Sequence, residues 1–118
     1  MSIATVHMVT VDCPDPAALG RFYQGVLGGE LEFPDDGWAV LRPPAGPPLG
    51  FQRVPGNIRP TWPEGAVPQQ SHLDLTVTDL DAAEKEVLAL GATRLAARPD
   101  QGWRVYADPV GHPFCLSL

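Results

Sequence analysis

Short stretches in which apolar and polar residues alternate run along the whole chain, and a period of two residues indicates β-strands. The breaks between them are rich in proline, glycine and aspartate, which end regular structure. The pattern predicts strands at Ile3–Asp12, Leu31–Phe33, Trp38–Arg42, Leu49–Val54, Ser71–Val77, Thr93–Ala97, Trp103–Ala107 and Pro113–Leu118.

Two other stretches have apolar residues at helical spacing. The first follows Asp15-Pro16 and the second follows Asp79, because an aspartate caps the free backbone amides at the start of a helix. They stop at Gly28-Gly29 and at Gly91, since glycine adopts the left-handed cap conformation at little cost. We assign Glu84, Lys85 and Glu86 to a solvated helix face. The predicted apolar faces are Leu19, Phe22, Tyr23, Val26 and Leu27 in the first helix, and Leu80, Ala83, Val87 and Leu90 in the second.

The order β-α-β-β-β therefore occurs twice, and the sequence itself repeats. Residues 37–51 read GWAVLRPPAGPPLGF and residues 102–116 read GWRVYADPVGHPFCL, at an offset of 65 residues. This predicts an α+β fold of two βαβββ modules within a single domain, residues 1–118. Module one is residues 1–54, a linker rich in proline and glycine is residues 55–70, and module two is residues 71–118.

Composition narrows the class of protein. The chain has 118 residues, 44% of them hydrophobic and 19% charged, as in an ordinary globular domain. A net charge of −6 argues against nucleic acid or an anionic membrane as partner. No apolar run approaches the roughly 20 residues of a membrane-spanning helix, and no leader pattern opens the chain. Cys13 and Cys115 form neither a zinc-finger spacing nor a disulfide framework, so we expect free thiols and a cytoplasmic protein.

The two βαβββ units, the "RFYQGVLGG" helix, the "HLDLTVTDLDAA" that opens the second half and the terminal "ADPVGHPFCL" together resemble the vicinal oxygen chelate superfamily. That superfamily includes glyoxalase I, extradiol dioxygenases, and bleomycin and fosfomycin resistance proteins. The resemblance covers nearly the whole chain and implies a glyoxalase-like fold, in which the two modules form a curled mixed sheet around a central cup. It implies several chemistries as well as plain binding, because one fold hosts many functions.

Enzymes of this superfamily hold a divalent metal in the cup, with a His on the first strand and a Glu on the last strand of each module. In this chain the corresponding positions hold Met8, Gly50, His72 and Cys115. His7 is next to Met8, and alternation along the strand places it on the opposite face unless a bulge turns it inward. The oxygen and nitrogen donors that suit Mg, Mn or Fe(II) are missing at three of the four positions.

The ligand set therefore favours no metal cofactor. A metal, if one binds, would be zinc or copper on His72 and Cys115, with His7 as a possible third ligand. The alternative for His72 is a polar residue of the cup that hydrogen-bonds to Asp74. Cys115 with His72 is also a candidate nucleophilic pair, and Asp12 and Asp74 are candidate general bases. The predicted cup residues are Met8, Thr10, Gly50, Gln52, His72, Asp74, Cys115 and Ser117.

The tryptophans have two interpretations each. Trp38 and Trp103 occupy equivalent strand positions and either pack in a core or interface or stack on a ligand. Trp62, in the proline-rich linker, either covers a sheet edge or closes the pocket. Cys13, which precedes a proline at a strand end, is assigned a structural role.

Three functional hypotheses follow. The first is a protein that binds an apolar or aromatic metabolite or antibiotic, for which an apolar cup with a few polar groups suffices. The second is a metal-independent isomerase or lyase that uses His72, Asp74 or Cys115. The third is a metal-dependent lyase or dioxygenase with an altered ligand set. The expected partners are a small molecule and, because closed dimers are the commonest oligomers, a second copy of the chain.

Overall fold

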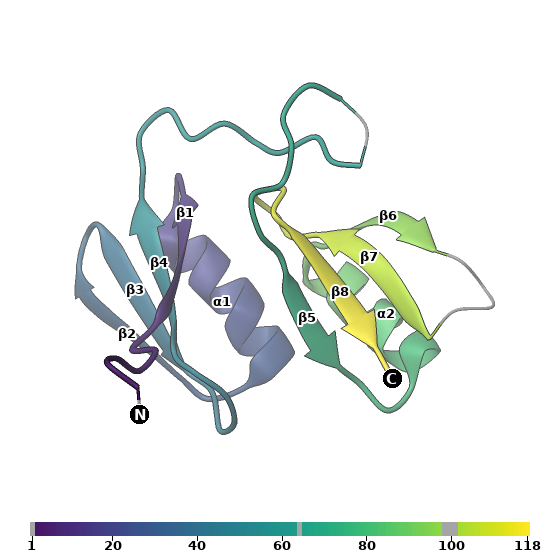
Figure 1. Cartoon of the computed structure of the whole chain (residues 1–118), viewed down its shortest axis with the longest axis horizontal. Coiled ribbons are helices and arrows are strands. Elements are labelled where there is room, and N and C mark those ends of the chain that lie inside the picture. Colours follow the sequence, from purple (N-terminus) through teal and green to yellow (C-terminus); the bar gives the residue numbers. More distant parts are fainter. Residues whose placement is uncertain (1, 64, 98–101) are drawn as a thin grey trace. The chain divides into compact units, whose positions relative to one another are not determined.

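The computed structural model describes residues 2–63, 65–97 and 102–118. The chain divides into two compact units, Met1–Asn57 and Ile58–Leu118, and each holds one four-stranded sheet and one helix (Figure 1). The predicted α+β class and the repeated β-α-β-β-β order are confirmed. Residues of the predicted linker from Ile58 onward group with the second unit.

Unit one contains β1 (Val9–Cys13), α1 (Pro16–Leu27), β2 (Glu30–Asp35), β3 (Trp38–Arg42) and β4 (Leu49–Arg53). The strand order across its sheet is β1-β4-β3-β2. The first strand runs parallel to β4, and the other neighbours are antiparallel. The sheet is therefore mixed, with the first and last strands of the unit side by side at one edge.

Unit two repeats this topology with β5 (Leu73–Thr76), α2 (Leu80–Leu90), β6 (Thr93–Ala97), β7 (Trp103–Ala107) and β8 (Pro113–Ser117). The order across its sheet is β5-β8-β7-β6, again with one parallel pair between the first and last strands. The two sheets therefore have the same strand order and the same pattern of parallel and antiparallel pairs.

Both helices start and end where the sequence predicts. Asp15 accepts a hydrogen bond from the amide of Ala18 at 3.2 Å, and Asp79 accepts one from the amide of Ala82 at 3.0 Å. The second helix ends at Gly91, whose φ of 118° lies in the region that favours glycine. These caps fix where each chain segment leaves its strand and begins to cross the sheet.

The helix of unit one packs on its sheet through an apolar core. Leu19, Phe22 and Tyr23 of α1 are buried, and the ring of Tyr23 stacks on Phe51 of β4 with 5.7 Å between centroids. Gly20 permits a close approach, because a Cβ there would meet a methyl group of Leu31 at 2.9 Å. This packing identifies the face of the sheet that carries the helix.

The helix of unit two packs through polar contacts as well. The hydroxyl of Tyr106 donates a hydrogen bond to Oε1 of Glu84 at 2.8 Å, and Arg104 pairs with Oε2 of Glu84 at 3.3 Å and with Asp81 at 2.7 Å. Arg94 lies 3.5 Å from the same Glu84 carboxylate. The prediction that Glu84 belongs to a solvated face was therefore wrong: strand residues far along the chain cover its carboxylate.

Two predicted strands are shorter than expected. Ile3–Asp12 was predicted, yet β1 begins at Val9, because its partner strand begins at Leu49 after Pro48, which has no backbone N–H to extend the ladder. Likewise β5 spans only Leu73–Thr76 of the predicted seven residues.

The predicted apolar face of α2 also ends earlier than expected. Val87 is buried, whereas Leu90 in the last turn is 42% exposed. Burial along α2 therefore includes Val87 and does not extend to Leu90.

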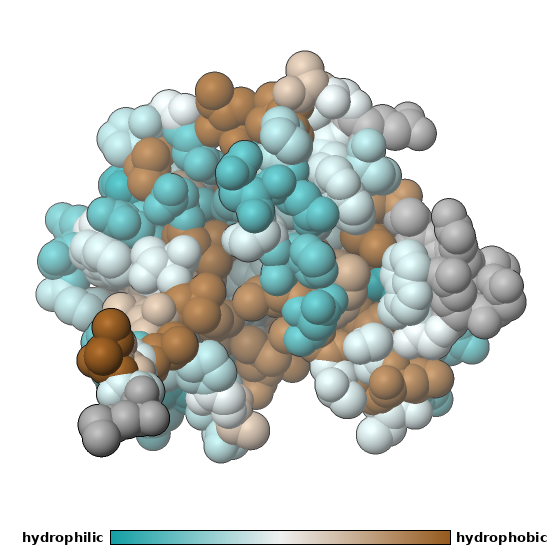
Figure 2. Space-filling model, viewed as in Figure 1, coloured by the Kyte–Doolittle hydropathy of each residue, from teal (hydrophilic) through white to brown (hydrophobic). Residues whose placement is uncertain are grey.

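Apolar and polar residues are interspersed on the face seen in Figure 2. Several large apolar side chains are exposed, including Ile3, Val6 and Ile58. No helix within residues 2–63, 65–97 and 102–118 has the length and apolar character needed to cross a membrane.

Candidate functional site

Each sheet has one face packed on its own helix and one face turned away from that helix, which we call the distal face. In unit one, Phe51 contacts α1, so its neighbours Gly50 and Gln52 lie on the distal face. In unit two, Tyr106 contacts α2, so Val105 lies on the distal face together with its partner Cys115. All the predicted site residues that belong to strands lie on these two faces.

The two distal faces have the same register. Thr10 pairs with Gly50 across β1 and β4, and Asp74 pairs with Cys115 across β5 and β8. Equivalent positions can therefore be compared directly between the units. They are Met8 and His72, Thr10 and Asp74, Gly50 and Cys115, and Gln52 and Ser117.

Unit two brings three predicted site residues together. His72 precedes β5, Asp74 lies within it, and Cys115 lies opposite on β8. The Nε2 atom of His72 is 3.3 Å from Oδ1 of Asp74, and donor atoms of all three residues lie within 4.8 Å of one another. The imidazole and the carboxylate remain accessible to solvent, with 36% and 69% of their side-chain surfaces exposed.

The thiol of Cys115 is held in its protonated form. Burial raises its pKa to about 11, and the charge of Asp74 and a hydrogen bond to Asp74 add to this effect. A nucleophilic thiol needs the opposite shift, from a nearby cation or base. The cluster of His72, Asp74 and Cys115 is thus a hydrogen-bonded group at neutral pH and not a thiolate–imidazolium pair.

The equivalent place in unit one holds no such group. Met8 lies over Gly50: a Cβ built on Gly50 would meet the Met8 sulfur at 2.6 Å and the Thr10 hydroxyl at 3.1 Å. Met8 therefore occupies the distal face, and β1 pairs with β4 without a bulge from Val9 onward. His7, next to Met8, is exposed.

Both faces carry a tryptophan at the same position. Trp38 pairs with Gln52, and Trp103 pairs with Ser117. Trp38 is half-buried, and Trp103 is 38% exposed. Each distal face thus combines an accessible indole with hydroxyl or amide groups. Trp62, which precedes Pro63 in the former linker, is half-buried in unit two.

Two further candidates, Asp12 and Cys13, lie at the end of β1. Asp12 pairs in register with Gln52, at the exposed end of β1. Cys13 is fully buried, and its thiol donates to the backbone oxygen of Gln52 at 3.6 Å, consistent with the structural role predicted for it.

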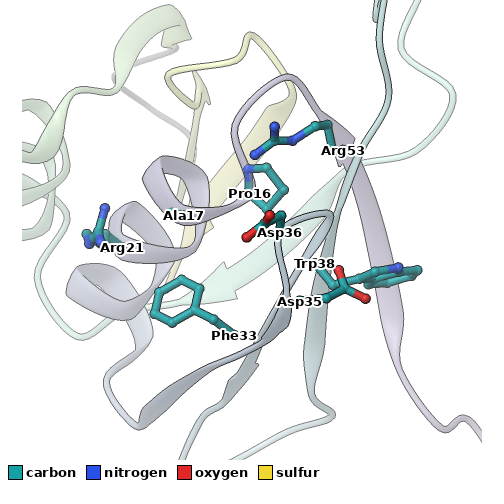
Figure 3. A pocket seen from close by; sticks show the side chains of 8 residues that line it. All are labelled: Pro16, Ala17, Arg21, Phe33, Asp35, Asp36, Trp38 and Arg53. Atoms are coloured by element: carbon teal, nitrogen blue, oxygen red, sulfur yellow. The ribbon is translucent and has the colours of Figure 1, made fainter.

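Unit one also has a pocket of about 250 Å³ that no sequence pattern predicted. It lies where the β2–β3 turn meets the start of α1, and Figure 3 shows the ring of Phe33 facing the helix, with Asp36 and Arg53 near Pro16. Arg21 lies with its guanidinium carbon 5.8 Å from the centre of the Phe33 ring. Three chain segments contribute to the lining, which includes two arginines, two aspartates and the Phe33 ring.

The family model of the glyoxalase-like domain matches residues 8–117. The chain belongs to the glyoxalase-like domain family. No curated protein sequence matches it significantly.

Solved structures share the glyoxalase-like fold at low sequence identity. A glyoxalase/bleomycin resistance protein/dioxygenase family enzyme from Burkholderia phytofirmans PsJN is 20% identical with a TM-score of 0.72, over 96% of this chain and 97% of that one. The fosfomycin resistance protein FosX from Mesorhizobium loti is 16% identical with a TM-score of 0.73, over 99% and 92% of the two chains. These likenesses confirm the fold predicted from the sequence and leave the activity open.

One relative contains a hard divalent cation. FosX from Listeria monocytogenes, in an E126Q variant complexed with Mn(II) and 1S,2S-dihydroxypropylphosphonic acid, is 17% identical over 98% of this chain and 90% of that one, with a TM-score of 0.72. Mn(II) prefers oxygen ligands. The glyoxalase-like chain described here offers a thioether and a glycine in unit one, so its donor set does not fit that ion. The imidazole, carboxylate and thiol of unit two fit a softer one.

Sequence reasoning found two members of the unit-two cluster as ligand positions and treated the third as a hydrogen-bond partner. The sequence did contain a signal for Asp74: it stands two residues after His72, and side chains two residues apart on a strand point to the same face. What the sequence did not show was that the carboxylate lies directly opposite Cys115 on β8.

Proposed function

We propose that this glyoxalase-like protein binds a small molecule with an apolar or aromatic surface on the distal faces of its sheets. The observation that carries the proposal is the partly exposed tryptophan at the same position of each distal face, Trp38 and Trp103, next to polar groups. An indole offers a large flat surface for stacking at low entropic cost, while nearby polar groups orient the ligand. Binding of this kind requires no metal.

Intrinsic tryptophan fluorescence tests this proposal. The protein is titrated with bleomycin and with a set of simple aromatic acids and phenols, and the stoichiometry is confirmed by calorimetry. We expect saturable binding of at least one probe. It should weaken about tenfold in Trp103→Leu or Trp38→Leu, which corresponds to the roughly 1.4 kcal/mol of one good stacking contact.

The third tryptophan supplies the matched control. Trp62→Leu removes an indole outside the strands and should leave the affinity unchanged, whereas Trp103→Phe should retain much of it because an aromatic ring remains. The proposal is wrong if no probe binds, or if binding is lost only in Trp62→Leu.

A second candidate is acid–base catalysis by an isomerase or lyase without a metal. The contact between Nε2 of His72 and Asp74 at 3.3 Å favours it, because a carboxylate fixes the orientation of an imidazole that exchanges protons with a substrate. Any probe that binds should therefore be followed by NMR for turnover. Conversion that disappears in His72→Gln would establish this activity in place of plain binding.

We also propose that the protein works as a homodimer in the cytoplasm. Cys13 and Cys115 are both thiols and form no disulfide with each other, which fits a reducing compartment. Analytical ultracentrifugation of the purified chain tests the dimer, and a monomer at all concentrations would exclude it. Fractionation of the source cells tests the location.

A further inference from the structure

We propose that His72, Asp74 and Cys115 form a three-ligand zinc site contained entirely in unit two. The site is distinct from a four-ligand set shared by two modules, because the equivalent residues of unit one are Met8 and Gly50. The inference goes beyond the proposed function, which needs no metal.

The backbone places these three donors together. Parallel pairing of β5 and β8 sets Asp74 directly opposite Cys115, and His72 stands two residues before Asp74, on the same side of the chain. A hydrogen-bonded ladder is a rigid support for ligands, since the positions of the Cβ atoms are fixed by the register. Only side-chain rotations are needed to adjust the donor atoms.

The distances suit a tetrahedral zinc ion. With zinc–nitrogen and zinc–oxygen bonds of about 2.0–2.1 Å and a zinc–sulfur bond of about 2.3 Å, neighbouring ligand atoms lie roughly 3.3–3.6 Å apart. Nε2 of His72 and Oδ1 of Asp74 are already 3.3 Å apart. The largest separation among the three donor atoms is within 4.8 Å, so a closure of about 1 Å completes the geometry.

The chemistry of the donors selects the metal. Thiolate and imidazole ligands suit zinc, whereas magnesium and manganese prefer oxygen ligands. Binding replaces the thiol proton of Cys115 with the metal and releases that proton to solvent. Because the imidazole and carboxylate are partly exposed, the fourth position of the ion stays open to water or to a ligand atom.

Cobalt(II) provides a spectroscopic test, because it adopts the zinc geometry and reports a thiolate ligand through a charge-transfer band. Protein treated with a chelator is titrated with Co²⁺ and then with Zn²⁺, and binding of Zn²⁺ is measured by calorimetry. We expect one ion per chain, a thiolate charge-transfer band, and displacement of Co²⁺ by Zn²⁺.

The chain supplies its own matched controls. Cys115→Ser should abolish the charge-transfer band, and His72→Ala and Asp74→Asn should weaken Zn²⁺ binding by at least about tenfold. The controls change the same three residue types in or next to β1 of unit one. His7→Ala, Asp12→Asn and Cys13→Ala should each leave the stoichiometry of metal binding and the spectrum unchanged. Circular dichroism verifies that each variant is folded.

Two results would overturn the zinc site. One is the absence of stoichiometric Zn²⁺ binding together with the absence of a thiolate band in the folded wild-type protein. The other is binding that survives in Cys115→Ser and is lost in His7→Ala. The fluorescence titration with organic probes is to be performed with a chelator present, so that no metal is bound. Its result then tests the proposed function alone, and the metal titration tests the zinc site alone.

Discussion

The sulfur of Met8 occupies the space that a side chain at position 50 would need, since a Cβ on Gly50 would lie 2.6 Å from it. In unit two the same two positions are His72 and Cys115, whose donor atoms belong to one cluster. The two halves of the repeat thus share a backbone and differ in chemistry at equivalent points. Unit one fills its position with a thioether, and unit two keeps polar donors.

The contact between Met8 and Gly50 predicts a coupled pair of substitutions. Gly50→Ala should destabilise the protein by about 1 kcal/mol, because the added methyl group forces the Met8 side chain aside. Met8→Ala should remove most of that penalty when the two are combined. Urea denaturation of the four proteins in this cycle measures the coupling, and strictly additive effects would show that the contact does not exist.

The environment of Cys115 predicts that its thiol is alkylated slowly at neutral pH. In a Cys13→Ala background with chelator present, alkylation by iodoacetamide should be slow at pH 8 and should accelerate as pH rises toward 11, because the pKa of the thiol is raised to about 11. Asp74→Asn removes a negative charge beside the sulfur, so the pKa should fall and the reaction at pH 8 should become faster. A rate that is already maximal at pH 8, or that is insensitive to Asp74→Asn, would contradict this environment.

The contacts of Glu84 predict that its side chain stabilises the packing of α2 on its sheet. Glu84→Ala should lower the free energy of unfolding by between about 1 and 3 kcal/mol, because the Tyr106 hydroxyl loses its charged acceptor. Glu86→Ala on the exposed face should change it by less than about 0.5 kcal/mol. Equal effects of the two substitutions, measured by urea denaturation, would rule out the interface described here.

The hydrogen bonds of Asp108 predict that its side chain stabilises the turn before β8. Its buried carboxylate oxygen accepts hydrogen bonds from the amides of Val110, Gly111 and His112, each at 3.0 Å. Asp108→Ala should destabilise the protein by about 2–3 kcal/mol, because these amides lose their acceptor. The exposed Asp36→Ala in the other unit is the control, with a change near zero. Thermal unfolding compares the two variants, and a stable Asp108→Ala protein would contradict the turn geometry.

Local signals explain why so much of the fold could be predicted from the sequence. The capping aspartates, the terminating glycines and the alternation in strands act within a few residues, and both helix boundaries followed from them. The length of β1 could not be predicted from local signals, because it depends on Pro48, which stands before the partner strand β4 about 40 residues away. Glu84 of α2 was misassigned because its contacts are also distant in sequence. Arg94 reaches it from β6, and Arg104 and Tyr106 reach it from β7.

The candidate site shows the same limit. The offset of 65 residues predicted that Gly50 and Cys115 are equivalent, and the distance to the capping aspartates predicted the same for Met8 and His72. The register agrees, because Gly50 pairs with Thr10 and Cys115 pairs with Asp74. Neither the opposition of Asp74 and Cys115 nor the pocket beside Phe33 could be found that way. Both arise from segments that meet only after the sheets have formed.

We propose that this glyoxalase-like chain lacks the ligand set for a hard divalent cation, because unit one has a thioether and a glycine where unit two has His72 and Cys115. Electron paramagnetic resonance of Mn²⁺ tests it most directly, because the signal of the free aqueous ion is lost when a protein binds it. With protein in excess, we predict that the free Mn²⁺ signal keeps its full intensity. A stoichiometric loss of that signal, reversed by His72→Ala, would contradict the claim.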